Sequence, residues 1–379
     1  MTNPSKGLAG VVAADTALSH VDGQAGRLIY RGYSIEDLGQ QASFEKVVHL
    51  LWHGELPTAE QLAAFSDRLT SKRDLPLALV EAMRNYPRQA HPMAALRTAV
   101  SALGMHDANP DDITPDGAYN KAVCLTASLP TLVATWERLR SGHEPLSPKA
   151  ELGHAANFLY MLSGKEPNPD AVRALDAYLV MLADHGFNAS TFAARVTVST
   201  LADVYSAVTT AIGTLKGAAH GGANQRAMEQ FLAADKRGDL EAWYRETRAG
   251  DQRIMGIGHR VYKVEDPRAR ILRPMAEALA ASSGQGRWYE IAAGIERLAR
   301  TDPYFIERDL YANVDFYSAV VLYMIGLPVD QFTCVFAISR VAGWTAHILE
   351  QLADNRLIRP KANYTGPRDK RYLPLGERR

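Results

Sequence analysis

The sequence predicts a mainly α-helical protein, and three observations support that fold class. Apolar residues recur at three- and four-residue intervals in one segment after another, as on the buried face of a helix. Proline and glycine stand mostly between these segments. Nearly half of the 379 residues are hydrophobic, so the chain can bury a large core. No fixed-period repeat is present, which disfavours a solenoid.

The expected elements follow from local signals along the chain. The glycine-containing N-terminal stretch has short β-prone runs such as residues 28–30, and predicts one or two brief strands. A helix over residues 43–52 opens on a possible serine cap, and one over 171–184 ends before a glycine, which leaves His185 at a helix C-terminus. The same spacing predicts helices at residues 125–139, 196–212, 223–233, 316–325 and 337–352.

Composition excludes several classes of function. Lys plus Arg and Asp plus Glu both number 42, so the net charge of zero does not favour nucleic acid as a partner. Cys124 and Cys334 lie far apart in apolar stretches, which predicts two buried free thiols rather than disulfides or a cysteine zinc cluster. We find neither a signal-peptide pattern nor about 18 uninterrupted apolar residues, so we expect no membrane association and a cytoplasmic location.

His220 lies in the first segment that suggests chemistry, GTLKGAAHGGANQRAMEQF. Small residues surround it, and a helix is expected to start just after Gly222. Free N–H groups at a helix start bind anions or polarise a carbonyl, while an imidazole supplies a hydrogen bond. A helix junction that needs glycine only for packing explains the segment equally well.

His259 lies in the second segment, RIMGIGHRVYKVEDPRAR, where Lys263 and Arg268 are among several nearby cations. Clustered cations suit carboxylate or phosphate binding. Gly256 and Gly258 form a lone G-x-G without the rest of a dinucleotide fingerprint, so we reject that motif. A solvated basic loop is the alternative interpretation.

Asp315 lies in the third segment, ERDLYANVDFYSAVVLYMIGLP, in the first turn of a helix that Asn313 can cap. The helix dipole favours the carboxylate there, so we expect an ordinary or lowered pKa unless burial raises it. Its apolar neighbours make a partly desolvated general base plausible, and a plain capping acid is the alternative.

Two arginines complete the set of candidates. Arg340 falls within an apolar helix, and Arg359 just precedes a proline. A buried arginine usually needs an anionic partner, which is more often a protein carboxylate, but several arginines together can hold a dicarboxylate bidentately. No compact metal-ligand spacing such as H-E-x-x-H is present, so we expect no metal.

Together these segments resemble the citrate synthases, and most closely the short bacterial and archaeal form, over nearly the whole chain. The most specific stretches are MGIGHRVYKVEDPRA, NVDFYSAVVLYMIGLP and FAISRVAGWTAHILEQ, to which HGGAN and DHGFNAST add. The family commonly has Pro-Leu before the first catalytic histidine, where this chain has Ala218 and Ala219. This difference bears on packing around the acyl group and on acyl or oxo-acid selectivity.

The resemblance implies condensation of acetyl-CoA with oxaloacetate, without a metal or a permanently bound cofactor. It implies that His220 hydrogen-bonds the thioester carbonyl, that Asp315 removes a methyl proton, and that His259 polarises the ketone. It further implies a homodimer in which Lys263 meets a CoA phosphate and one arginine reaches in from the partner subunit. The substrate carboxylates would be bound by His185, Arg268 and Arg340 of one subunit, and by Arg359, which is the arginine that the other subunit supplies.

The resemblance also implies two helical domains. Residues 1–219 and 323–379 form a large domain, and residues 220–322 form a smaller one that closes over the substrates. Two alternatives remain. A 2-methylcitrate synthase would use the same residues with propionyl-CoA, and a catalytically silent helical binding protein would keep only the fold. We expect acetyl-CoA to be preferred.

Overall fold

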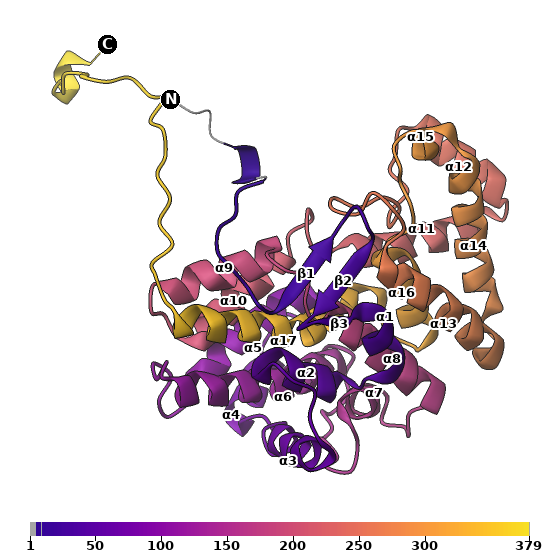
Figure 1. Cartoon of the computed structure of the whole chain (residues 1–379), viewed down its shortest axis with the longest axis horizontal. Coiled ribbons are helices and arrows are strands. Elements are labelled where there is room, and N and C mark those ends of the chain that lie inside the picture. The colour runs from indigo at the N-terminus through magenta and orange to yellow at the C-terminus, as the bar shows by residue number, and fades with distance from the viewer. Residues whose placement is uncertain (1–4, 9, 379) are drawn as a thin grey trace.

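The computed structural model describes residues 5–8 and 10–378, and it confirms the predicted helical fold class. Within these residues there are seventeen α-helices, three short strands and three 3-10 turns. Figure 1 shows one large body of helices, a second group of helices to its side, and a long C-terminal segment that leaves the body.

The strands lie near the N-terminus, as predicted, and form a small antiparallel sheet in the order β1-β2-β3. Ser19 pairs with Tyr30 and Asp22 with Arg27, which joins the first two strands as a hairpin. Leu28 and Tyr30 are fully buried, so one face of the sheet packs on the body. The strands are β1 (Ser19–Asp22), β2 (Arg27–Tyr30) and β3 (Tyr33–Ser34).

The large body is built around one long central helix, α17 (Phe332–Ala353). Helices α2, α6, α8, α9 and α10 pack around it, so it is apolar on nearly all sides. The stretch Val329–Ala353 is long and apolar enough to cross a membrane, but 94% of its most apolar window is buried inside the protein, as in a core helix. The surrounding helices are α1 (Ile35–Gln41), α2 (Phe44–His53), α3 (Ala59–Thr70), α4 (Leu77–Arg84), α5 (Pro92–Gly104), α6 (Pro115–Arg140), α7 (His154–Ser163), α8 (Pro169–Leu182), α9 (Ala189–Ser199) and α10 (Val204–Leu215).

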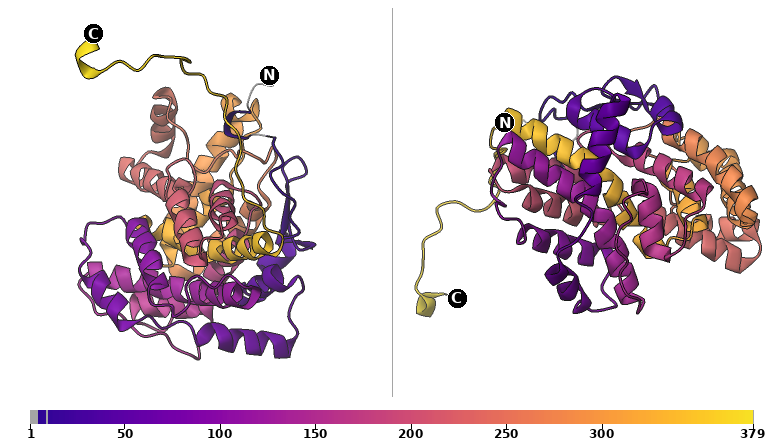
Figure 2. Two further views of the ribbon diagram at one scale, coloured as in Figure 1. Left: turned by 90° about the vertical axis from the view of Figure 1, so that its left-hand side faces the viewer. Right: turned by 90° about the horizontal axis from the view of Figure 1, so that it is seen from below.

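The second group of helices runs from α11 to α16 and lies to one side of the body in Figures 1 and 2. Its members pack mainly on one another, with α13 against α16 and α11 against α16 as the most extensive pairs. The group covers nearly the same residues as the small domain expected over residues 220–322, and the division into two domains and the movement of the smaller one stay predictions. It comprises α11 (Ala223–Arg237), α12 (Leu240–Ala249), α13 (Pro267–Ser283), α14 (Gly286–Thr301), α15 (Pro303–Ile306) and α16 (Val314–Met324).

Most predicted helices are present, but the prediction of a single helix over residues 196–212 is wrong. The chain leaves α9 at Ser199, passes through Leu201 with a positive φ of 65°, and enters α10 with Asp203 as its N-cap. The apolar spacing continues across this break because both helices turn an apolar face to α17. The thiols also differ from expectation, since Cys334 is buried but Cys124 is only partly so.

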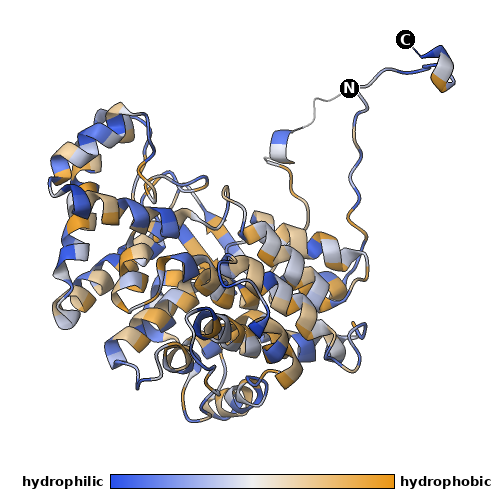
Figure 3. Cartoon of the chain, turned by 180° about the vertical axis from the view of Figure 1, so that it is seen from behind, coloured by the Kyte–Doolittle hydropathy of each residue, from blue (hydrophilic) through white to orange (hydrophobic). Residues whose placement is uncertain are grey.

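Hydropathy follows the architecture. In Figure 3 apolar residues gather inside the helical body, while the outer faces and the C-terminal segment are largely polar. After α17 the chain runs through residues 354–378 with only the short 3-10 turn Leu375–Glu377. Almost all of these residues are exposed, so this segment gains little from packing on its own chain.

Candidate active site

His220 lies in the turn between α10 and α11, where glycines allow the chain to fold closely on itself. A Cβ atom on Gly221 would lie 2.3 Å from the Leu215 carbonyl oxygen, so no larger residue fits there. The Ser190 N–H donates to His220 Nε2 at 3.3 Å, and the Ser190 hydroxyl lies 2.8 Å from the same nitrogen. With Nε2 as acceptor, the neutral ring carries its proton on Nδ1. Burial lowers the pKa of His220 to about 4, so the ring is neutral at pH 7.

Hydrogen bonds also fix the tautomer of His259, but through the other ring nitrogen. Its Nδ1 accepts the backbone N–H groups of Val261 and Tyr262, both at 3.1 Å. The proton of the neutral ring is therefore on Nε2. Burial, and then the positive charge of Arg268, lower the pKa of His259 to about 4. Both histidines are thus neutral hydrogen-bond donors, each with the opposite nitrogen occupied by backbone N–H groups.

His185 follows α8 and joins His259 in a cluster of rings. The His185 and His259 ring centroids are 5.5 Å apart, and those of His259 and Tyr262 are 4.7 Å apart. The His185 Nε2 lies 3.1 Å from the Tyr262 hydroxyl. Burial holds the pKa of His185 well below its usual range, so this ring is neutral too.

Asp315 stands in the first turn of α16, as predicted, and its environment links it to the His259 loop. Asn313 caps the helix by accepting the Asp315 N–H at 2.9 Å, and the Asn313 Nδ2 donates to the Gly258 carbonyl oxygen at 2.7 Å. Gly256 has φ 78°, and a Cβ on it would lie 2.8 Å from Phe316 Cα. Burial raises the pKa of Asp315 to about 6, against the opposing charge of Arg268, so this pKa lies above its ordinary value.

Arg268 is buried and its guanidinium is largely committed to a protein carboxylate. Its Nε and Nη2 donate to the two Asp266 oxygens at 3.0 and 2.8 Å. Asp266 also accepts the Val314 N–H at the start of α16, at 3.2 Å. Nη1 is the one nitrogen of this guanidinium without a hydrogen-bond partner among the described residues. Through Asp266, Arg268 therefore connects the start of α13 to the start of α16, and only its Nη1 is left to bind a ligand.

Arg340 differs, because its charge has no paired anion. Its side chain is 2% exposed, and its Nε donates to the Leu182 carbonyl oxygen at 2.7 Å. Across residues 5–8 and 10–378, no carboxylate oxygen lies within 4 Å of the Arg340 guanidinium. The alternative interpretation, an ion pair with a protein Asp or Glu, is thus not formed in this part of the chain. A buried, unpaired guanidinium is suited to the carboxylate of a bound ligand.

The remaining two candidates lie at the surface. Lys263 is exposed, and its backbone N–H donates to the Gly23 carbonyl oxygen at 2.9 Å, which seats the loop on the β1–β2 hairpin. Arg359 is exposed in the segment after α17, and the structure does not bring it to the cluster formed by the other candidates.

Sequence reasoning missed the residues that orient the candidates. Ser190 orients His220, and the Trp344 Nε1 in turn donates to the Ser190 Oγ at 3.1 Å. Tyr262 contacts His185, and Asp266 binds Arg268. Asp266 carries a local signal, since it lies two residues before Arg268, whereas Ser190 and Trp344 meet only in the folded chain.

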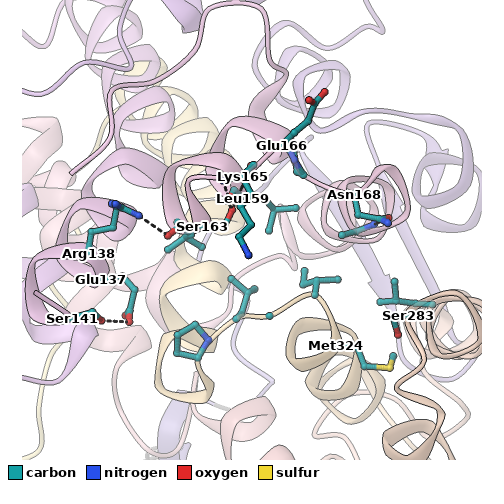
Figure 4. Close-up of a pocket in the computed structure, with 18 of the residues that line it drawn as sticks. Glu137, Arg138, Ser141, Leu159, Ser163, Lys165, Glu166, Asn168, Ser283 and Met324 are labelled. Carbon is teal, nitrogen blue, oxygen red and sulfur yellow. Dashed lines mark hydrogen bonds between the residues drawn. The ribbon is translucent and has the colours of Figure 1, made fainter. Parts of the chain in front are cut away.

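A half-open cavity of about 480 Å³ lies away from these residues. The C-terminal ends of α6, α7, α13 and α16 meet there, whereas α13 and α16 begin at the candidate site. Figure 4 shows the Lys165 side chain pointing into the cavity, while Glu166 points away. Among the described residues, no group of three or more His, Cys, Asp or Glu is arranged to hold a metal ion.

Comparison with known proteins identifies relatives that match nearly the whole chain. A family model described as "Citrate synthase, C-terminal domain" matches residues 7–361. Citrate synthase of Haloferax volcanii is 49% identical over 98% of both chains, and citrate synthase 2 of Bacillus subtilis is 44% identical over 99% of both. A 2-methylcitrate synthase of Mycobacterium tuberculosis is 42% identical over 97% of this chain and 92% of its own.

Solved structures agree in fold over nearly the same length. Citrate synthase from Pyrobaculum aerophilum matches with a TM-score of 0.90 and 42% identity, covering 98% of this chain and 95% of that one. Citrate synthase from Thermoplasma acidophilum, in a ternary complex with carboxymethyl coenzyme A and oxaloacetate, matches with a TM-score of 0.93 and 34% identity over both whole chains.

The helical fold and the matched relatives define a transferase of the class that condenses acyl-CoA with an oxo acid. The chain belongs to the citrate synthase family. The resemblance drawn from its sequence is therefore confirmed.

Proposed function

We propose that this chain condenses acetyl-CoA with oxaloacetate and water to give citrate and CoA. The observation that carries the proposal is the matched pair of neutral histidines. His220 offers Nδ1–H and His259 offers Nε2–H, because backbone N–H groups occupy the opposite nitrogen of each ring. Asp315, with a pKa of about 6, supplies a carboxylate base at neutral pH.

The first step is removal of a methyl proton from the acetyl thioester. The Asp315 carboxylate takes the proton, and the released electron pair moves into the carbon–carbon bond as the thioester oxygen gains negative charge. His220 Nδ1–H donates to that oxygen. A preorganised donor of this kind contributes about 3–4 kcal/mol to lowering the barrier, which a lone carboxylate cannot supply.

The second step forms the new carbon–carbon bond. The enolate carbon attacks the ketone carbon of oxaloacetate, and the ketone oxygen takes a proton from His259 Nε2 as the alkoxide forms. The proton that Asp315 removed from the methyl group replaces the one given up by His259, so both side chains return to their starting states. Holding both substrates in register contributes as much as the donors do. Water then cleaves the citryl thioester and releases CoA.

The anionic groups of the substrates match the cations of the site. Arg340, buried and unpaired, binds one oxaloacetate carboxylate, and Arg268 Nη1 and His185 bind further oxygens. Lys263, exposed on its loop, meets a CoA phosphate. The reaction needs no metal and no permanently bound cofactor.

A homodimer belongs to the same proposal. Arg359 is exposed, and its segment runs away from its own body in Figures 1 and 2. An extended segment of this kind suits contact with a second copy, to whose substrate Arg359 would add a carboxylate contact. A cytoplasmic location is also kept as a proposal.

One observation favours a second acyl substrate. Ala218 and Ala219, beside His220, are small and exposed. They add little bulk next to the histidine proposed to bind the thioester oxygen, and one relative is named 2-methylcitrate synthase.

Release of CoA in the presence of oxaloacetate tests the proposal, with acetyl-CoA and propionyl-CoA compared at steady state. A higher kcat/KM for acetyl-CoA supports citrate synthesis, and a higher value for propionyl-CoA supports 2-methylcitrate synthesis. Release of CoA from neither would leave a helical binding protein.

A further inference from the structure

Arg226 lies one turn into α11 and holds the loop that carries His220. Its Nη2 donates to the Ala218 carbonyl oxygen at 2.6 Å, and its Nε donates to the Gly222 carbonyl oxygen at 3.0 Å. These two carbonyls flank His220 on either side in the sequence. One planar guanidinium therefore spans the loop and fixes the separation of its ends.

Few other side chains could hold this loop. Ala218 and Ala219 are exposed, and two glycines follow His220. Gly222 stands at the N-cap of α11, and none of the side chains that the structure describes caps that helix. The loop is otherwise tied by its own backbone, as in the bond from His220 N–H to Gly217 O at 2.9 Å, and by Thr333 Oγ1, which donates to Gly221 O at 3.2 Å.

The Arg226 charge also acts on the proposed base. Within the described ranges no carboxylate oxygen lies within 4 Å of the Arg226 guanidinium, so its charge is not neutralised by an ion pair. Helix α11 packs on α16, with the Phe231 and Phe316 rings 5.0 Å apart. The positive charge of Arg226 lowers the pKa of Asp315, which stands at the start of α16.

Other charged and titratable groups face Asp315 from the neighbouring elements. Arg268 at the start of α13 and Arg340 on α17 also lower the pKa of Asp315, and Asp266 raises it. Tyr178 on α8 interacts with the same carboxylate. Arg226 is the one cation of this set that also binds the His220 loop.

We propose that Arg226 is a positioning residue that couples the two halves of the site, by holding the His220 loop and by keeping a positive charge near Asp315. The inference rests on the proposed condensation reaction. In this role Arg226 acts on the reaction indirectly, through the donor on one side and the base on the other.

Arg226→Met tests both roles, because it keeps the apolar stem and removes the donors and the charge. We expect kcat for CoA release to fall about tenfold or more as His220 loses its placement, with the oxaloacetate KM changed less than about twofold. We also expect the acid limb of kcat/KM to move up by at least about half a pH unit, because loss of a nearby cation disfavours the Asp315 carboxylate.

Arg226→Lys separates the two roles. It keeps the charge, so the acid limb should stay within about 0.2 pH units of the parent, but it cannot span both carbonyls, so kcat should still fall severalfold. Arg237→Met is the matched control, since Arg237 lies on the same helix, is exposed and pairs with Glu246. It should leave both kcat and the acid limb unchanged.

Three results would overturn the proposal. These are a parent-like kcat in Arg226→Met, a lower kcat in that variant with an unmoved acid limb, and a parent-like kcat in Arg226→Lys. If Arg226→Met does not fold, Arg226→Gln is judged by the same criteria for kcat and the acid limb. Failure of the parent to release CoA at all would instead refute the proposed function, so the two failures are distinguishable.

Discussion

Asp315→Asn removes the proposed base while nearly preserving the size of the side chain. The cap of α16 survives, because Asn313 accepts the backbone N–H of residue 315 rather than its side chain. A general base contributes about 10²- to 10⁴-fold to a rate. We therefore expect kcat to fall at least about a hundredfold, which is about 2.7 kcal/mol, with the oxaloacetate KM little changed.

The same change should stabilise the protein at neutral pH. Burial raises the pKa of Asp315 from 3.8 to about 6. Above pH 6 the Asp315 carboxylate is ionised in the folded protein, and its burial lowers the free energy of unfolding by up to about 3 kcal/mol. Because the side chain is partly exposed, the expected cost is about 1–2 kcal/mol. Asn carries no charge, so we expect Tm at pH 7.5 to rise by about 1–3 °C.

The sign of this effect depends on pH. Because the folded-state pKa is the higher one, the proton binds the folded state more tightly. The destabilisation is therefore full above pH 6 and disappears as pH falls towards 3.8. The gain in Tm of Asp315→Asn should shrink over the same range.

Steady-state CoA release and thermal unfolding from pH 5 to 8 measure both effects. Asp111→Asn is the control, because Asp111 is exposed in the loop before α6. Near-parent turnover in Asp315→Asn would remove Asp315 from the mechanism. A lowered Tm at pH 7.5 would refute the claim that burial of the ionised Asp315 carboxylate destabilises the folded protein.

Three further predictions follow from the site. The parent kcat/KM should fall below about pH 6 as Asp315 is protonated, and His220 and His259, each with a pKa of about 4, should add no limb above pH 6; a limb near 7 in the pH profile would contradict this. Arg340→Leu should raise the oxaloacetate KM or lower kcat by more than about tenfold, against an exposed Arg173→Leu control; unchanged kinetics would make Arg340 structural. Gly256→Ala should lower Tm and kcat more than Gly284→Ala, which shares a positive φ but has open space for the Cβ; equal effects by calorimetry and assay would contradict the close approach to α16.

The fold class was predictable because its signals are local. Apolar spacing and polar caps mark each helix, and the Asn313 cap that places Asp315 was visible in the sequence. The break between α9 and α10 was not, because apolar spacing continues through it and only Asp203 marks the new start. Spacing reports which face is buried, not where the backbone turns.

The sequence allowed candidate site residues to be named, but it did not allow their electrostatic environment to be predicted. The Asp315 pKa depends on burial between α16 and distant elements, which no local pattern encodes. The tautomers of His220 and His259 depend on backbone N–H groups, and for His220 the donor, Ser190, lies 30 residues away in the sequence. The pairing of Arg268 with Asp266 is the exception, since the two residues are close in sequence.

The most direct test of the central claim is release of CoA from acetyl-CoA by the purified parent protein, with and without oxaloacetate. The account predicts turnover only when oxaloacetate is present, with citrate formed in equal amount and no metal added. Absence of citrate, or CoA release that does not depend on oxaloacetate, would contradict it.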